Sequence, residues 1–166
     1  MPLDARFVPA SVTTPADVDA TTLLPSRADL IERLGERVTT ADDAPVALVL
    51  LGLLRREDGW PTPPSTLSVV TSTLARDIRG SDWLARSGPT EFALLFDGPV
   101  HAAEVAATRL VAAVSAARLP GLSAAAGVAP LTPRATGSEI HRRATLCLAA
   151  ARSIGGGQVI TYSGAR

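Results

Sequence analysis

The feature that most constrains the fold is an uninterrupted apolar run over residues 46–54. A strand with one face in water alternates apolar and polar residues, so a continuous run predicts a strand covered on both faces. Helix-breaking residues bound the run, at 42–45 before it and in the proline-rich segment 55–64 after it. Nine residues are too few to cross a bilayer as a helix. The chain must therefore place other elements on both faces of a sheet.

Apolar residues that recur about every 3.6 positions predict helices, which would form these outer layers. In the first, Leu30, Ile31, Leu34 and Val38 share one face, and Ser26 is the predicted N-cap. A second helix is expected to be capped by Ser65 and to turn Leu67, Val70, Leu74 and Ile78 inward. The predicted helices span 27–38, 65–79, 99–118 and 136–154.

Further short strands are predicted between the helices. Residues 83–87 and 92–96 are joined by Gly88-Pro89-Thr90-Glu91 and form a predicted hairpin. The remaining strands are predicted at 122–129 and 158–162. Strands mixed with helices that pack on the sheet indicate an α+β class, an α/β sandwich. We expect one domain over 21–163 and an N-terminal arm or linker over 1–20.

The composition limits which partners the protein can bind and in which cellular compartment it is expected. The chain has 166 residues, a formal net charge of zero and a pI near 6.7, so it lacks the basic surface expected for binding nucleic acid. Its single cysteine, Cys147, cannot form an internal disulfide and is expected in the core. No segment resembles a signal peptide or a membrane span, so we expect a soluble, cytoplasmic protein. Lysine and asparagine are absent from the sequence.

Four segments, taken in order, resemble the motifs of GGDEF domains, the diguanylate cyclase family. Residues 79–92, Arg-Gly-Ser-Asp-Trp-Leu-Ala-Arg-Ser-Gly-Pro-Thr-Glu-Phe, resemble the segment that ends in the family signature. Residues 19–27 resemble the opening motif, 122–129 the later strand and 143–155 the closing helix. The resemblance covers about 19–163, and it implies a central, mostly antiparallel sheet with helices packed around it.

The resemblance also implies a degenerate signature. Diguanylate cyclases join two GTP molecules with the help of metal ions held by an aspartate of the first strand and the acidic third signature residue. Here Gly52 and Thr90 hold these positions, Leu54 replaces a second aspartate, and Pro89 replaces the second glycine. A hydroxyl is a poor substitute for a carboxylate on Mg²⁺. The five signature residues are Gly88, Pro89, Thr90, Glu91 and Phe92.

Other family residues are replaced as well. The family reads guanine with an asparagine and an aspartate, yet this chain has no asparagine. Its phosphate-binding lysine corresponds to Arg152, and a later arginine corresponds to Gly156. We therefore predict no catalytic residues, no metal, no cofactor and no cyclase activity, so the chain is not expected to be an enzyme.

A ligand site of the family is retained in the sequence. The family's product-inhibition site is an Arg-x-x-Asp motif that ends five residues before the signature, and Arg79 and Asp82 match its type and its offset. Asp82 can accept from guanine N–H groups, while Arg79 can bind phosphate or stack on the base. Arg109 lies at about the position of a third family residue. A turn aspartate and a helix-terminal arginine would explain Arg79 and Asp82 without any ligand.

Other candidate residues have simpler explanations. His101 and His141 lack metal-ligand spacing and are predicted at the surface. Arg86 is expected to be a surface or structural residue, and Ser87 has no His–acid context for nucleophilic catalysis. Gly155-Gly156-Gly157 is predicted to end a helix rather than to bind phosphate. Trp60 and Trp83 either offer a docking surface or pack in the core.

Three functions remain open. The first is a catalytically inactive GGDEF-like effector that binds cyclic di-GMP at Arg79, Asp82 and Arg109. The second is a nucleotide-independent interaction module with an unknown protein partner, and a homodimer is possible. The third is GTP binding without turnover, which the missing guanine-reading residues disfavour. Neither nucleic acid nor membrane is an expected partner.

Overall fold

The structure is a computed structural model that describes residues 19–56 and 61–164. The predicted arm therefore lies almost wholly outside the described residues, as does Trp60. The described helices are α1 (Arg27–Val38), α2 (Pro64–Asp77), α3 (Val100–Ala116) and α4 (Gly137–Ile154). The strands are β1 (Val46–Arg55), β2 (Trp83–Gly88), β3 (Glu91–Asp97), β4 (Leu122–Pro130) and β5 (Val159–Thr161).

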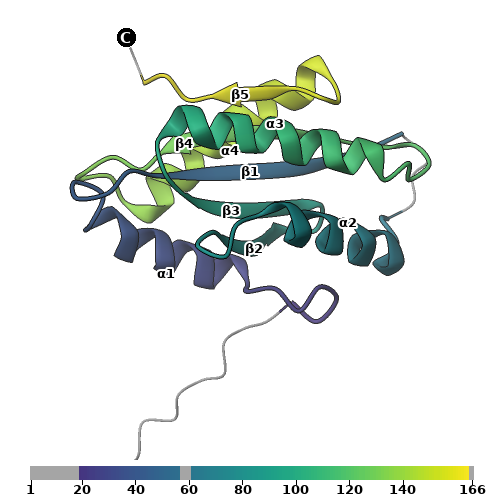
Figure 1. Ribbon diagram of the computed structural model, residues 1–166, viewed down its shortest axis with the longest axis horizontal. Helices are drawn as coiled ribbons and strands as arrows, with labels where there is room; N and C mark the ends of the chain where they lie inside the picture. The colour runs from purple at the N-terminus through teal and green to yellow at the C-terminus, as the bar shows by residue number, and fades with distance from the viewer. Residues whose placement is uncertain (1–18, 57–60, 165–166) are drawn as a thin grey trace, which may run out of the picture.

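The strands form one five-stranded sheet in the order β2-β3-β1-β4-β5 (Figure 1). All neighbouring pairs are antiparallel except β4 and β5, which are parallel. The apolar run forms β1 at the centre, with β3 on one side and β4 on the other. The predicted α+β class, with a mostly antiparallel sheet and helices around it, is confirmed.

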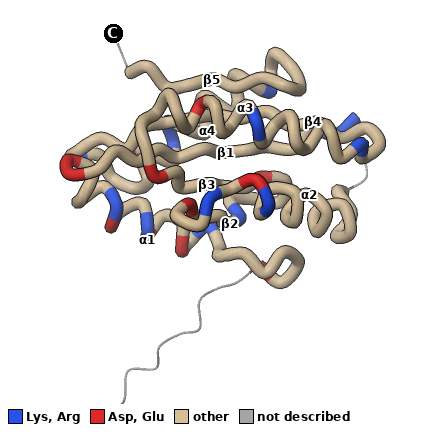
Figure 2. The backbone as a smooth tube through the Cα atoms, viewed as in Figure 1, with Lys and Arg blue, Asp and Glu red and all other residues tan. Residues whose placement is uncertain are grey.

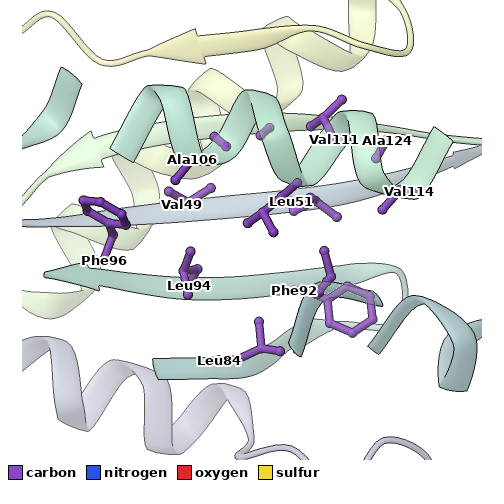
Figure 3. Packing of buried hydrophobic residues seen from close by; sticks show 14 of the residues in the cluster. Val49, Leu51, Leu84, Phe92, Leu94, Phe96, Ala106, Val111, Val114 and Ala124 are labelled. Atoms are coloured by element: carbon purple, nitrogen blue, oxygen red, sulfur yellow. The ribbon is translucent and has the colours of Figure 1, made fainter. Parts of the chain in front are cut away.

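The alternation of side chains along β1 explains why both faces are covered. Val49 and Leu51 point to one face and pack with α2 and α3, while Leu48 and Leu50 point to the other and pack with α1 and α4. Figure 3 shows the first of these clusters, in which side chains of β1 and β3 lie against α3. Every residue of β1 from Val46 to Leu53 is buried, as the continuous apolar pattern predicts.

The helix ends agree with the sequence at α1 and differ at α2. Ser26 caps α1 and forms a capping box with Asp29, as its N-cap position predicts. The second helix does not begin at a Ser65 cap: Pro63 is its N-cap, and Pro64, whose fixed φ suits the first turn, begins it. It also ends at Asp77 rather than at residue 79, because Ile78 is extended, with φ −90° and ψ 158°. The Arg-x-x-Asp motif thus lies in a turn.

Charged side chains are kept out of the sheet's centre. β4 contains none, and β1 has only Arg55 at its end (Figure 2). Cys147 is buried in α4, as expected, and burial raises the pKa of its thiol. Among the described residues, no helix combines the length and the apolarity needed to span a bilayer.

Candidate functional site

The signature segment forms the tip of the β2–β3 hairpin. Gly88 pairs with Glu91, so Pro89 and Thr90 make a two-residue turn, and the pairing register shifts between Arg86 and Gly88. The backbone N–H of Leu53 donates to the Thr90 carbonyl at 2.8 Å. This bond fastens the hairpin tip to the end of β1. The tip therefore lies beside the strand position at which the family resemblance requires an aspartate.

That strand position is Gly52, which is the β-pair partner of Glu91. The guanidinium of Arg152, from the last turn of α4, lies directly over it. A Cβ built on Gly52 would be 2.3 Å from Arg152 Nη2 and 2.6 Å from Nε. The same guanidinium donates from Nη1 to Glu91 Oε1 at 2.9 Å. In this position the Arg152 guanidinium occupies the space that a side chain at position 52 would enter.

This arrangement does not suit the divalent cation that the family resemblance implies. Hard cations such as Mg²⁺ require converging oxygen ligands. Gly52 and Leu54 offer no side-chain oxygen, and the carboxylate of Glu91 is already paired with a positive guanidinium. In the described part of the chain, no group of three or more histidine, cysteine or acidic residues is placed to hold a metal ion.

A buried Ser–His contact lies next to the hairpin tip. Ser87 Oγ and His141 Nε2 are 3.0 Å apart, and both residues are buried. The prediction that His141 lies at the surface is wrong. Gly137, His141, Ala144 and Leu148 all line the inward face of α4, so helical spacing alone would have placed the histidine inside. Burial lowers the pKa of His141; the charge of Arg27 lowers it further, and Glu91 opposes the shift.

Arg86 is a buried residue of β2, so a structural role is confirmed for it and a surface position is not. Its side chain is 8% exposed, and its guanidinium lies 5.0 Å from the centre of the Phe92 ring. Nη2 donates to the Pro89 carbonyl at 2.7 Å, which braces the hairpin turn. Burial lowers the pKa of Arg86, and Asp19, whose Oδ2 is 3.9 Å from Nε, opposes this shift.

The Arg-x-x-Asp motif forms a compact turn between α2 and β2. Asp82 Oδ2 accepts from the backbone N–H of Arg79 at 3.0 Å, and the N–H of Asp82 donates to the Arg79 carbonyl at 3.0 Å. Asp82 Oδ1 accepts from the backbone N–H of Asp97 at 3.3 Å, which ties the turn to the end of β3. The exposed Arg79 guanidinium lies 5.5 Å from the centre of the Phe96 ring.

Arg109, the third residue predicted for this site, lies on α3. Its Nη2 donates to the carbonyl of Asp77, the last residue of α2, at 2.8 Å. The structure therefore brings the three predicted residues into one neighbourhood, on the α2–β2 turn and the adjacent face of α3. Arg79 and Arg109 are exposed there, and Asp82 is half-buried.

No protein-family model matches the chain, and no curated protein sequence matches it. Solved structures match its fold. The GGDEF domain of DgcB from Caulobacter crescentus, solved with cyclic di-GMP, superposes with a TM-score of 0.79 at 21% identity, over 92% of this chain and 99% of that one. The FimX GGDEF domain from Pseudomonas aeruginosa gives 0.75 at 24% identity, over 86% and 97%.

A third similar structure is the active GGEEF domain of a diguanylate cyclase from Vibrio cholerae. Its TM-score is 0.70 at 17% identity, and the match covers 86% of this chain and 99% of that one. At these identities the similarity establishes the fold alone. The chain has a GGDEF-like fold, as its sequence motifs predicted.

Proposed function

We propose that this chain is a catalytically inactive GGDEF-like domain that binds cyclic di-GMP as a signalling effector, through Arg79, Asp82 and Arg109. The observation that supports the proposal is that the Asp82 carboxylate holds the α2–β2 turn through the Arg79 backbone, while Arg109 reaches the end of α2 at the Asp77 carbonyl. Two structures of the same fold support it: the DgcB domain and another microbial GGDEF domain were both solved with cyclic di-GMP.

The chemistry of the turn suits a guanine nucleotide. The Arg79 guanidinium has no hydrogen-bond partner within the described residues, so its donors are free for phosphate or for a base. The Asp82 carboxylate has about four lone-pair sites, of which two backbone N–H groups use two. The others remain for the N1–H and N2–H groups of a guanine.

The inactivity rests on separate observations. Joining two GTP molecules requires metal ions, held by carboxylates, that neutralise the negative charge of the phosphates. Here the guanidinium of Arg152, rather than a carboxylate, occupies the space above Gly52. Thr90 at the hairpin tip supplies no carboxylate, and Pro89 has no N–H to donate. We infer that several independent replacements together abolish cyclase chemistry.

A nucleotide-independent interaction module is the alternative function. One observation favours it: both oxygens of Asp82 accept from backbone N–H groups, so the residue holds the turn without any ligand. In this alternative, Arg79 is a solvated side chain packed on Phe96, and replacing it affects no nucleotide binding.

Titration calorimetry with cyclic di-GMP separates the two functions. Wild type is expected to release or absorb heat on binding, and Arg79→Ala to weaken the affinity by about tenfold or more, since charge-assisted hydrogen bonds contribute about 1.5–3 kcal/mol. Arg109→Ala is expected to act in the same direction.

Arg76→Ala is the matched control. Arg76 is an exposed arginine of α2 one turn before the motif, so its loss changes the net charge equally and leaves the site intact. Absence of binding by wild type, or equal affinity of the Arg79 and Arg76 variants, would rule out the proposed ligand site and favour the interaction module.

A further inference from the structure

A cavity of about 340 Å³ lies beside the hairpin tip, on the side of the N-terminal turn. The turn at Asp19 and the start of α1 form one wall, and the end of β2 forms the other. The described residues that line it are Asp19, Ser26, Arg27, Arg86, Ser87, Gly88 and Pro89. None of the contacts assigned to cyclic di-GMP involves this cavity. It lies at the opposite end of β2 from Asp82, roughly 15 Å away at the usual rise of a strand.

One wall of the cavity contains a buried cation without a full set of acceptors. Arg86 makes one guanidinium hydrogen bond, to Pro89, and its Nε and Nη1 atoms are buried with no acceptor in the described part of the chain. The carboxylate of Asp19 approaches to 3.9 Å, which is too long for a hydrogen bond. Since buried charge is poorly screened, this guanidinium makes the cavity attractive to an anion.

A second guanidinium stands at the rim. Arg27 is the first residue of α1, is exposed, and has no hydrogen-bond partner among residues 19–56 and 61–164. The exposed Arg27 therefore offers accessible N–H donors to a ligand. The buried Arg86 contributes positive charge from the wall of the cavity.

Asp19 limits which anions fit. Its Oδ1 accepts from the backbone N–H groups of Thr21 and Thr22 and from the Thr22 hydroxyl, and these bonds hold the turn. Its Oδ2 has no hydrogen-bond donor within the described residues. A bare dianion would be repelled by this oxygen, whereas a ligand hydroxyl could donate to it. The cavity thus offers positive charge for a phosphate and one acceptor for a neighbouring hydroxyl.

We propose that this cavity binds a phosphomonoester of a small hydroxylated molecule, with the phosphate between Arg27 and Arg86 and a hydroxyl on Asp19. The cavity is larger than a single phosphate group and is large enough for a sugar phosphate. Ser87, which lines the cavity and contacts His141, adds a hydroxyl near the phosphate position.

The test uses ribose 5-phosphate, inorganic phosphate and ribose as probes, titrated into the full chain at constant ionic strength and followed by calorimetry. Ribose 5-phosphate is expected to bind at millimolar or lower concentration, more tightly than inorganic phosphate, and ribose not to bind. Arg27→Gln is expected to weaken ribose 5-phosphate by about tenfold. Arg76→Gln, which removes an exposed arginine from α2, is expected to leave the affinity unchanged.

Arg27 is exposed, so its replacement leaves the core intact, and an unchanged melting temperature of the ligand-free variant verifies this. Absence of ribose 5-phosphate binding, or equal weakening by the Arg27 and Arg76 variants, overturns the site. Equal affinity for inorganic phosphate and ribose 5-phosphate overturns the assignment to an ester. The proposed function is tested separately, by cyclic di-GMP titration of wild type and the Arg79 variant. Failure of this cavity to bind ribose 5-phosphate can therefore be distinguished from failure of the proposed function.

Discussion

The side chains at the hairpin tip contact residues that are far away in the sequence. Glu91 pairs with Arg152 across 61 residues, and Ser87 contacts His141 across 54. Gly52 belongs with Glu91 and Arg152, because the absence of a side chain at Gly52 leaves room for the Arg152 guanidinium. At this scale, the described contacts at the tip are an ion pair, a Ser–His contact and a close approach of a guanidinium to Gly52.

The fit between Gly52 and Arg152 can be tested by unfolding. Gly52→Ala is expected to lower the free energy of unfolding by about 1 kcal/mol, because the new Cβ displaces a flexible guanidinium from its partly exposed bond to Glu91. In an Arg152→Ala background the same substitution should have a smaller effect. Urea denaturation of wild type, both single variants and the double variant gives the coupling. Equal costs in both backgrounds would contradict the contact.

His141 makes a pH-dependent contribution to stability. The fold holds its pKa below the ordinary value of 6.5, so the unfolded chain takes up the proton first as the pH falls. The contribution is complete above about pH 6.5 and is lost as the pH falls from there toward the folded-state pKa. Unfolding free energies measured between about pH 7.5 and 5.5 should therefore decline.

His141→Gln should flatten that decline, because the substituted side chain does not titrate. His101→Gln is the matched control, since His101 is exposed and its replacement should leave the decline in place. A decline of equal size in wild type and in the His141 variant would show that other groups cause it.

At the scale of elements, local patterns predicted most of the fold. The apolar run predicted β1, apolar spacing predicted the first two helices, Ser26 marked the start of α1, and Pro99 marked the start of α3. The end of α2 was not predictable from apolar spacing, because Ile78 continues the helical pattern while its backbone is extended to form the turn. The placement of Arg152 over Gly52 was also hidden, since it depends on how α4 crosses the sheet.

The crossing of α4 over β4 depends on Gly127. A Cβ there would be 2.3 Å from the backbone of both Ala144 and Leu148, which cannot move without shifting the helix. Gly127→Ala is expected to lower the free energy of unfolding by about 3 kcal/mol or more. Gly35→Ala, in α1 with open space around it, is expected to raise it by about 0.5–1 kcal/mol. Thermal or urea unfolding compares the two, and a Gly127 variant as stable as wild type would refute the close approach.

At the scale of the whole molecule, the GGDEF-like fold keeps two regions of different character along one hairpin. The end near Asp82 and Arg79 presents the exposed Arg79 guanidinium and a turn held by Asp82. The tip near Glu91 is closed by an internal ion pair with Arg152. The sequence predicted the hairpin itself, because its two strands and its turn are neighbours along the chain. The closure of the tip required the structure, since only the fold brings α4 to β1.

Incubation of the purified chain with GTP and Mg²⁺, followed by chromatographic detection of cyclic di-GMP, tests the proposed loss of catalysis most directly. An active GGEEF domain run in parallel verifies the assay. We expect no product above a protein-free blank, because Gly52 and Thr90 supply no carboxylate for a metal ion and Glu91 is paired with Arg152. Formation of cyclic di-GMP above that blank, in proportion to the amount of protein, would overturn the proposed inactivity.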